Sequence, residues 1–126
     1  GRWQTINTNP LVICDAGHNI DGIKSTINQL SDMVYNQLHF VIGMVADKDT
    51  FEILNILPKN GIYYYCKPNI PRGLDENYLA EAAFKAGLNG KAYTSVTQAL
   101  NSAKNNAGID DLIFVGGSTF VVAEVI

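Results

Sequence analysis

Short apolar segments alternate with amphipathic segments along this sequence, and the alternation limits the folds that the chain can adopt. Four apolar runs, at residues 11–14, 40–45, 62–66 and 112–115, are strand-sized, as expected for strands buried on both faces. The segments between them carry apolar residues at steps of three and four, which predicts helices with one buried face. The chain is therefore expected to be an α/β protein, a Rossmann-like three-layer sandwich with a mainly parallel sheet and helices on both faces.

Periodicity and end signals place the helices. The first is predicted from a recurring apolar set: Ile20, Ile23, Ile27, Leu30 and Val34. The second carries apolar residues at 51, 53, 54 and 57 and stops near Pro58, because proline cannot continue a helix. The last apolar segment, residues 120–126, predicts a final helix. Residues 3–8 alternate apolar and polar, which suits an edge strand, and residues 91–93 are expected to add a short strand.

Two further helices carry capping signals. Asp75 is a predicted N-cap, Leu74 and Leu79 are spaced for a hydrophobic staple, and Gly87 suits the C-terminal end. The other opens at Ser95, where Gln98 completes a capping box, and it closes at Gly108.

Composition narrows the function classes. With 126 residues, 47% of them hydrophobic, the chain has the size of one domain, residues 1–126. The net charge is −3 and the nine Lys and Arg residues are scattered, so neither nucleic acid nor a membrane surface is an expected partner. There is no apolar run long enough to span a bilayer. Cys14 and Cys66 lie in apolar segments, which predicts reduced thiols in a cytoplasmic protein.

The turn at residues 15–19, Asp-Ala-Gly-His-Asn, follows a buried strand and precedes a helix. In open α/β sheets, ligands bind beyond the carboxyl ends of the strands. Gly17 is expected to allow a tight turn, and the helix N-terminus favours an anion such as phosphate. Asp15 can accept hydrogen bonds from ribose hydroxyls, and His18 can donate to an oxygen of the ligand. The alternative is that Asp15 and Asn19 only cap the turn and that His18 is solvated.

Two other strand ends carry unusual residues. Residues 47–49, Asp-Lys-Asp, either form a solvated loop that caps the next helix or place Lys48 near a phosphate. Residues 116–118, Gly-Gly-Ser, form a possible backbone nest for an anion or simply cap the last helix. A metal site from Cys14, Asp15 and His18 is opposed by strand alternation, because adjacent residues point to opposite faces; no metal site is expected.

Familiar catalytic patterns are missing from the sequence. It has neither the phosphate-binding G-x-x-x-x-G-K-S/T loop nor a G-x-G-x-x-G fingerprint. Its two histidines are His18 and His39, and they form no convincing Ser-His-Asp or Cys-His arrangement. His39 stands at the start of a strand and is expected to be structural.

Several segments in this order resemble the C-terminal domain of the folylpolyglutamate synthase/dihydrofolate synthase family, within the Mur ligase superfamily. The segments that carry the resemblance are Gly-Arg-Trp-Gln at 1–4, Asp-x-x-His-Asn at 15–19, Asp-Lys-Asp at 47–49, Pro-Arg-Gly at 71–73, and Gly-Ser at 117–118 with Ala-Glu-Val at 123–125. The resemblance rests on these five segments together, in this order. One departure is Ile20, where the family usually has proline.

The resemblance implies an ATP-dependent ligase that adds L-glutamate to a dihydropteroate or folate carboxylate through an acyl phosphate. It implies that Arg2, Asp15, His18 and Asn19 contact the ATP ribose and phosphates, Arg2 with a fork suited to the developing charge. Lys48, Arg72 and Ser118 are implied glutamate contacts, Arg72 as a bidentate partner of the carboxylate. No catalytic residue is expected on this domain alone.

The resemblance also implies that a second domain completes the ATP site. The phosphate-binding loop, the Mg²⁺ ligands and most of the folate site belong to an N-terminal ATPase domain, so this domain, expected to be monomeric, is expected to be inactive by itself. Two alternatives stay open: a Mur-type ligase acting on peptidoglycan precursors, and a non-catalytic α/β module that binds a nucleotide. The sequence does not distinguish dihydrofolate synthase from folylpolyglutamate synthase.

Overall fold

A computed structural model of the chain describes residues 3–8, 10–46 and 49–126. Its six strands form one sheet in the order β1-β2-β6-β3-β4-β5. The strands are β1 (Gln4–Thr8), β2 (Leu11–Cys14), β3 (Leu38–Ile42), β4 (Ile62–Tyr65), β5 (Asn89–Ala92) and β6 (Leu112–Gly116). The helices are α1 (Ile20–Ser31), α2 (Thr50–Ile56), α3 (Glu76–Lys85), α4 (Val96–Asn106) and α5 (Thr119–Ala123).

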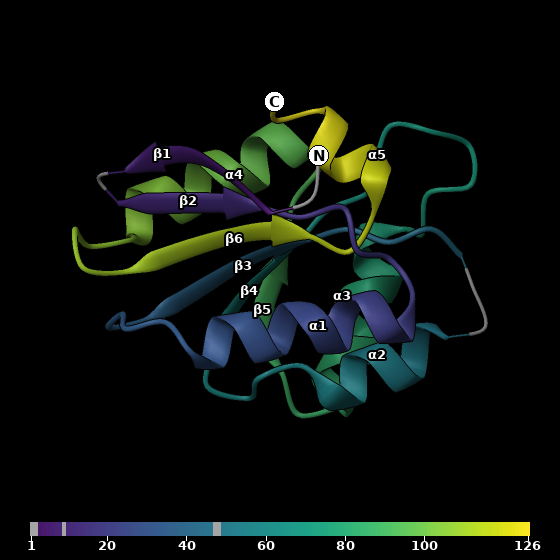
Figure 1. Cartoon of the computed structure of the whole chain (residues 1–126). Helices are drawn as coiled ribbons and strands as arrows, with labels where there is room; N and C mark the ends of the chain where they lie inside the picture. Colours follow the sequence, from purple (N-terminus) through teal and green to yellow (C-terminus); the bar gives the residue numbers. More distant parts are fainter. Residues whose placement is uncertain (1–2, 9, 47–48) are drawn as a thin grey trace.

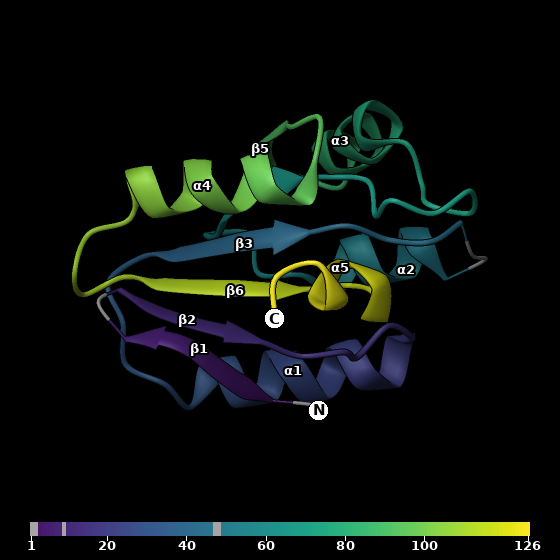
Figure 2. The ribbon, with the colours of Figure 1, turned by 90° about the horizontal axis from the view of Figure 1, so that it is seen from above.

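The sheet is parallel except at one edge. β2, β6, β3, β4 and β5 pair in parallel, while β1 runs antiparallel to β2. Figure 2 shows β2, β6 and β3 pointing the same way, with β1 reversed beside them. The carboxyl ends of the parallel strands therefore meet at one end of the molecule, together with the loops that follow them. The predicted mainly parallel sheet with an edge strand is confirmed.

Helices cover both faces of the sheet and make three layers (Figure 1). On one face, α1, α2 and α3 bury side chains such as Ile23, Leu54 and Leu79 against the inward residues of the strands. On the other face, α4 and α5 bury a smaller cluster that includes Ala99 and Val121. The central strands β3 and β6 are buried along their whole length, which explains why, apart from His39, their sequences are apolar.

Two predicted helix ends are wrong. α1 ends at Ser31, and Val34 is fully exposed. The helix tightens into a last turn in which Asp32 donates to the Gln29 carbonyl, while the Ser31 hydroxyl donates to the Asn28 carbonyl. A serine side chain near a helix end competes for backbone carbonyls in this way. The final helix is also shorter than predicted, since α5 ends at Ala123.

The strand predicted to reach residue 45 ends earlier, at Ile42. Beyond it the backbone stays extended but changes partner: the Met44 carbonyl accepts from Leu74 and the Ala46 amide donates to Arg72. Gly43 allows this departure, because a Cβ there would lie 2.6 Å from the Cys66 carbonyl oxygen. Tertiary pairing, not the apolar pattern, sets this boundary.

The predicted N-caps of α3 and α4 are present in the structure. The Asp75 carboxylate accepts from the amides of Asn77 and Tyr78, and Gly87 adopts the left-handed conformation just past α3. The Ser95 hydroxyl accepts from the Gln98 amide, as predicted. The reciprocal half of the capping box is absent among the described contacts, since the Gln98 side chain bonds to the Thr94 hydroxyl instead.

Within the described ranges, none of the helices has the length and apolar character required to cross a lipid bilayer.

Candidate functional site

The turn at residues 15–19 lies at the carboxyl end of β2 and leads directly into α1. Asn19 is the N-cap of α1, and its side-chain Oδ1 accepts a hydrogen bond of 2.8 Å from the Gly22 amide. This bond satisfies one of the free amides that every helix start leaves open. The predicted capping role of Asn19 is therefore present, and its side-chain NH₂ group remains available as a donor.

Asp15 is not a solvated turn residue. It is only 7% exposed, and its Oδ2 accepts a hydrogen bond of 3.0 Å from the hydroxyl of Thr26, on the buried side of α1. Its backbone amide donates to the Val115 carbonyl of β6 at 3.1 Å. A buried carboxylate needs such partners, because an unpaired one would be costly to remove from water. The fold thus fixes both the backbone and the side chain of Asp15.

Gly17 makes this turn compact, in line with the tight turn that the sequence predicts, but without a left-handed backbone. Its backbone is not in the left-handed region, which Gly87 and Gly117 alone occupy among the described residues. A Cβ on Gly17 would instead lie 3.1 Å from the Gly22 carbonyl oxygen, and a Cβ on Gly22 would lie 3.1 Å from the Gly17 Cα. The two glycines let the turn pack directly against the first turn of α1.

A pocket of about 500 Å³ opens beside this turn. Its lining comes from the turn, one face of α1 and the start of α5: Asp15, Ala16, Gly17, His18, Asn19, Gly22, Ser25, Gln29 and Thr119. His18 is exposed at its rim. The pocket therefore combines a held carboxylate, an imidazole and an amide group within a volume typical of small-molecule sites. Such groups suit a ligand with hydroxyls and anionic oxygens.

The neighbouring strand end, Gly116-Gly117-Ser118, is packed tightly. Gly117 has φ +94°, and a Cβ there would lie 2.6 Å from the Gly43 carbonyl oxygen. Ser118 is buried and caps α5, its hydroxyl oxygen accepting from the Phe120 amide at 3.1 Å. Of the two roles considered for this segment, the capping role is the one with a contact in the structure.

Arg72 lies on a loop that pairs with the segment after β3. Its carbonyl accepts from the Ala46 amide at 3.1 Å, and Val45 forms an isolated bridge with Gly73. The structure therefore brings residues 72–73 next to residues 45–46, in the segment that follows β3. Arg72 itself is exposed, so its guanidinium is accessible to a ligand. Arg2, Asp47 and Lys48 lie outside the described residues.

The buried thiols argue against a metal site here. Cys14 packs in the cluster beneath α4 and α5, whereas the Asp15 carboxylate bonds to α1 on the other side of the sheet. Burial, followed by the nearby Asp15 charge, raises the pKa of the Cys14 thiol, and a thiol must lose its proton to bind a metal. Among the described residues, no group of three or more His, Cys, Asp or Glu side chains could hold a metal ion.

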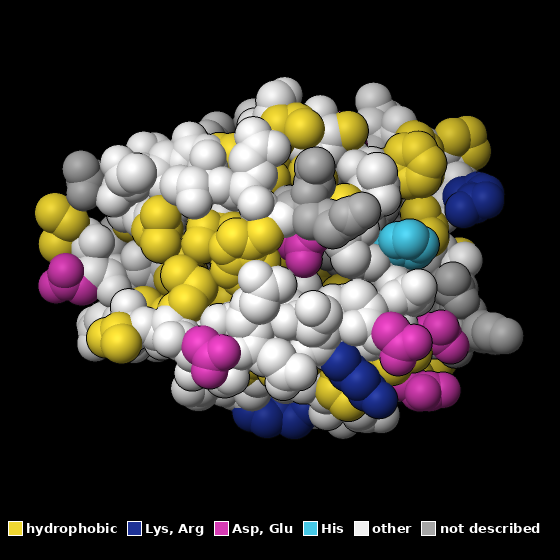
Figure 3. Space-filling model, viewed as in Figure 1, with side chains coloured by type: hydrophobic (Ala, Val, Ile, Leu, Met, Phe, Trp, Pro, Cys, Tyr) yellow, Lys and Arg dark blue, Asp and Glu magenta, His cyan; other side chains and the backbone are white. Residues whose placement is uncertain are grey.

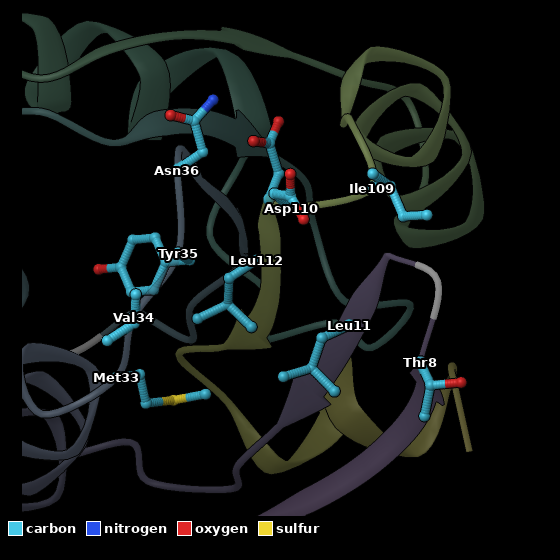
Figure 4. A pocket seen from close by; sticks show the side chains of 10 residues that line it. Thr8, Leu11, Met33, Val34, Tyr35, Asn36, Ile109, Asp110 and Leu112 are labelled. Carbon is cyan, nitrogen blue, oxygen red and sulfur yellow. The ribbon is translucent and has the colours of Figure 1, made fainter.

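A second hollow, of about 360 Å³, lies at the opposite end of the sheet (Figure 4). Residues 33–36, after α1, and residues 109–112, which lead into β6 and include its first residue, form much of its wall together with Thr8 and Leu11. The space-filling view also shows hydrophobic side chains gathered between β2 and α1, with few positive ones on this face (Figure 3). This end holds the amino ends of the parallel strands, where α/β proteins do not usually bind ligands.

His39 belongs to this opposite end, inside the fold. It is 2% exposed, with Nδ1 2.8 Å from the Tyr64 hydroxyl and Nε2 2.9 Å from Asp111 Oδ2. The structure thus places it among buried structural contacts, as its position at a strand start predicts.

Comparison with known proteins decides the family. Residues 1–119 match the family model described as "Mur ligase, glutamate ligase domain". The chain belongs to the Mur ligase glutamate ligase domain family. The predicted resemblance is confirmed.

Curated relatives of this glutamate ligase domain are folate enzymes. This chain is 36% identical over 127 residues to the "Probable bifunctional folylpolyglutamate synthase/dihydropteroate synthase" of Haloferax volcanii, and the match covers 98% of this chain and 15% of that protein. It is 34% identical over 127 residues to the "Dihydrofolate synthase/folylpolyglutamate synthase" of Escherichia coli, covering 99% of this chain and 29% of that protein. The chain thus spans less than a third of the length of these relatives.

Solved structures agree with the sequence relatives. The domain superimposes with a TM-score of 0.89 and 32% identity on "E.coli FolC in complex with DHPP and ADP", covering 99% of this chain and 30% of that one. A second solved structure, of the bifunctional synthase from Yersinia pestis "complexed with AMPPNP and Mn ion", superimposes on this chain with a TM-score of 0.88 and 29% identity. It again covers 99% of this chain and 30% of that one. The α/β fold of the glutamate ligase domain is therefore the fold of this chain.

Sequence reasoning missed part of the site. The apolar pattern of the first helix does not single out Thr26, Ser25 or Gln29, yet Thr26 bonds to Asp15 and the other two line the pocket. A polar residue within the buried stripe, as Thr26 is between Ile23 and Leu30, is the signal that could have found the first.

Proposed function

We propose that this domain is the C-terminal part of an ATP-dependent ligase that adds L-glutamate to dihydropteroate or folates through an acyl phosphate. The observation that carries the proposal is the Asp15–Asn19 turn, in which a fixed carboxylate, an exposed imidazole and an amide meet at one pocket. Its relatives are named as folylpolyglutamate and dihydrofolate synthases, and this favours the folate branch over a peptidoglycan-precursor ligase.

In this proposal Asp15 accepts hydrogen bonds from the ribose of ATP, while His18 and the amide of Asn19 donate to its oxygens. Arg2 contributes a guanidinium to the phosphates. One solved relative is described "with Mn, AMPPNP and L-Glutamate bound", which supports ATP, a divalent metal and glutamate as ligands of the complete enzyme. The described residues form no metal cluster, so Mg²⁺ is assigned to the N-terminal ATPase domain and no role of this domain depends on it.

Arg72 and Lys48 are the proposed glutamate contacts. Arg72 is exposed, and its backbone carbonyl accepts from the Ala46 amide in the segment that follows β3 at the carboxyl end of the sheet. A guanidinium pairs with a carboxylate through two parallel hydrogen bonds. In this proposal Ser118 keeps its implied contact to glutamate through its O–H group, while its buried hydroxyl oxygen caps α5 by accepting from the Phe120 amide.

The partner in this proposal is the N-terminal ATPase domain of the same protein, in a monomeric enzyme. The relatives are about three to seven times as long as this chain, as their covered shares of 15–30% show. A domain that supplies only one wall of the ATP site is expected to have no turnover alone. The free, buried cysteines support a reducing compartment such as the cytoplasm.

The test uses the full-length protein and ATP-dependent ligation of glutamate to dihydropteroate and to a reduced folate. Asp15→Ala and His18→Ala are each expected to raise the KM for ATP about tenfold or more, as loss of a hydrogen bond to a charged group does. Arg72→Ala should raise the KM for glutamate. Lys24→Ala, on the exposed side of α1 outside the pocket lining, is the matched control.

The outcomes separate the candidates. Unchanged KM values for ATP in both Asp15→Ala and His18→Ala would refute the site. Ligation to a UDP-linked muramyl peptide precursor, but to neither folate substrate, would favour the peptidoglycan branch. ATP binding by the full-length protein with no ligation of any acid would favour a non-catalytic module.

A further inference from the structure

The Thr26 hydroxyl has an unusual partner, and this contact has a consequence for the ATP site. We propose that Thr26 is a positioning residue that holds the Asp15 carboxylate in the orientation in which it meets the nucleotide. The inference rests on the proposed function, because it takes Asp15 to be an ATP contact. Thr26 itself is 1% exposed and touches no ligand in this proposal.

The Thr26 hydroxyl donates its hydrogen bond to a side chain that is distant in the sequence. A threonine hydroxyl within a helix ordinarily bonds to the backbone carbonyl three or four residues before it. Here the hydroxyl donates instead to Asp15 Oδ2, eleven residues earlier, at 3.0 Å. Valine would fill the same space in the apolar stripe between Ile23 and Leu30, so packing alone does not require a hydroxyl at this position.

The rest of Asp15 is fixed independently of Thr26. Its amide bonds to the Val115 carbonyl, and its carbonyl oxygen faces Gly116, where a Cβ would lie only 3.2 Å away. The backbone is therefore held by β6, and rotation of the side chain is the freedom that remains. Thr26 removes that freedom by binding one carboxylate oxygen.

The other carboxylate oxygen is left for the ligand. Within the described part of the chain, Tyr65 Oη is the single buried side-chain oxygen or nitrogen without a partner. Asp15 Oδ1 makes no hydrogen bond there and is not among the buried unpartnered atoms, so it is open to the pocket that Asp15 lines. A carboxylate with one oxygen held and the other exposed is preorganised to accept a hydrogen bond from a ribose hydroxyl.

The test compares Thr26→Val with Thr26→Ser in the full-length enzyme. Thr26→Val keeps the shape and removes the hydroxyl, whereas Thr26→Ser keeps the hydroxyl. We expect Thr26→Val to raise the KM for ATP about tenfold, which corresponds to about 1.4 kcal/mol, with the KM for glutamate unchanged. Thr26→Ser should stay within about twofold of the wild type. If Thr26→Val does not fold, the KM for ATP of Thr26→Ala is compared with that of Thr26→Ser instead.

A double variant separates positioning from a structural role. If Thr26 acts through Asp15, adding Thr26→Val to Asp15→Ala should not raise the KM for ATP further, because the residue to be positioned is gone. Independent, multiplying effects would overturn the inference. So would an unchanged KM for ATP in Thr26→Val when Asp15→Ala raises it, a result that leaves the proposed site intact. An unchanged KM in Asp15→Ala itself would instead refute the proposed site, and the inference with it.

Discussion

The buried network around His39 offers a quantitative test of what stabilises this fold. Asp111 Oδ1 and Oδ2 also accept from the amides of Gln37 and Gly108, and the Asn106 side chain donates to the Tyr64 hydroxyl at 3.3 Å. Because a carboxylate only accepts, His39 Nε2 donates to it, and in the neutral ring Nδ1 accepts from Tyr64. The imidazole thereby joins β3, β4 and the loop before β6.

His39→Leu removes both hydrogen bonds of the ring without opening a large cavity. A hydrogen bond to a charged group contributes about 1.5–3 kcal/mol and a neutral one about 1 kcal/mol. Asp111 and Tyr64 each keep another partner, and burial of the leucine side chain offsets part of the loss. The expected decrease in the free energy of unfolding is therefore about 2–3 kcal/mol, or a fall in Tm of about 10 °C for a domain of this size.

Urea unfolding followed by circular dichroism, with thermal unfolding in parallel, measures this change. Ser102→Ala, which removes one neutral hydrogen bond to the Tyr93 hydroxyl, is the control and should cost about 1 kcal/mol. A loss from His39→Leu that is no larger than the control would refute the reasoning, because it would mean that the bonds of the ring contribute nothing beyond packing.

The same network sets a dependence on pH. Burial raises the pKa of the Asp111 carboxyl, but hydrogen bonds from the Gly108 amide, from His39 and from the Gln37 amide outweigh it and leave the pKa lowered. A lowered folded-state pKa stabilises the protein above the unfolded pKa, and this stabilisation is lost as the pH falls through the folded value. The difference in stability between the wild type and Asp111→Asn should therefore shrink below about pH 3.8. A constant difference from pH 7 to pH 2 would contradict this.

Two further changes test the packing. Gly117→Ala should lower the free energy of unfolding by about 2–4 kcal/mol, since it combines a left-handed φ with a Cβ 2.6 Å from the Gly43 carbonyl oxygen. The control is Gly108→Ala, whose Cβ would lie 3.8 Å from the Asp111 carboxylate and which should be nearly neutral. Equal effects of the two substitutions would refute this account. Burial raises the pKa of the Cys66 thiol to about 12, so it should resist a disulfide reagent at pH 8 until urea unfolds the chain. Rapid labelling of Cys66 in the folded protein would show that the thiol is accessible.

The sequence alone determined the elements and many of their ends. Period-3.6 stripes and continuous apolar runs specify helices and buried strands through contacts within a few residues, and Asp75 and Ser95 mark helix starts because their caps are equally local. It also identified the Asp15–Asn19 turn, since a polar turn between a buried strand and a helix is visible in the chain itself.

Only the tertiary structure decided what those residues contact. The end of β3 at Ile42 follows from pairing with a loop thirty residues away, and α1 stops before the apolar Val34. The bond from Thr26 turned Asp15 from a candidate cap into a fixed carboxylate at a pocket. The physical reason is that local patterns report which face of an element is buried, whereas a hydrogen bond between two elements depends on how they are packed together.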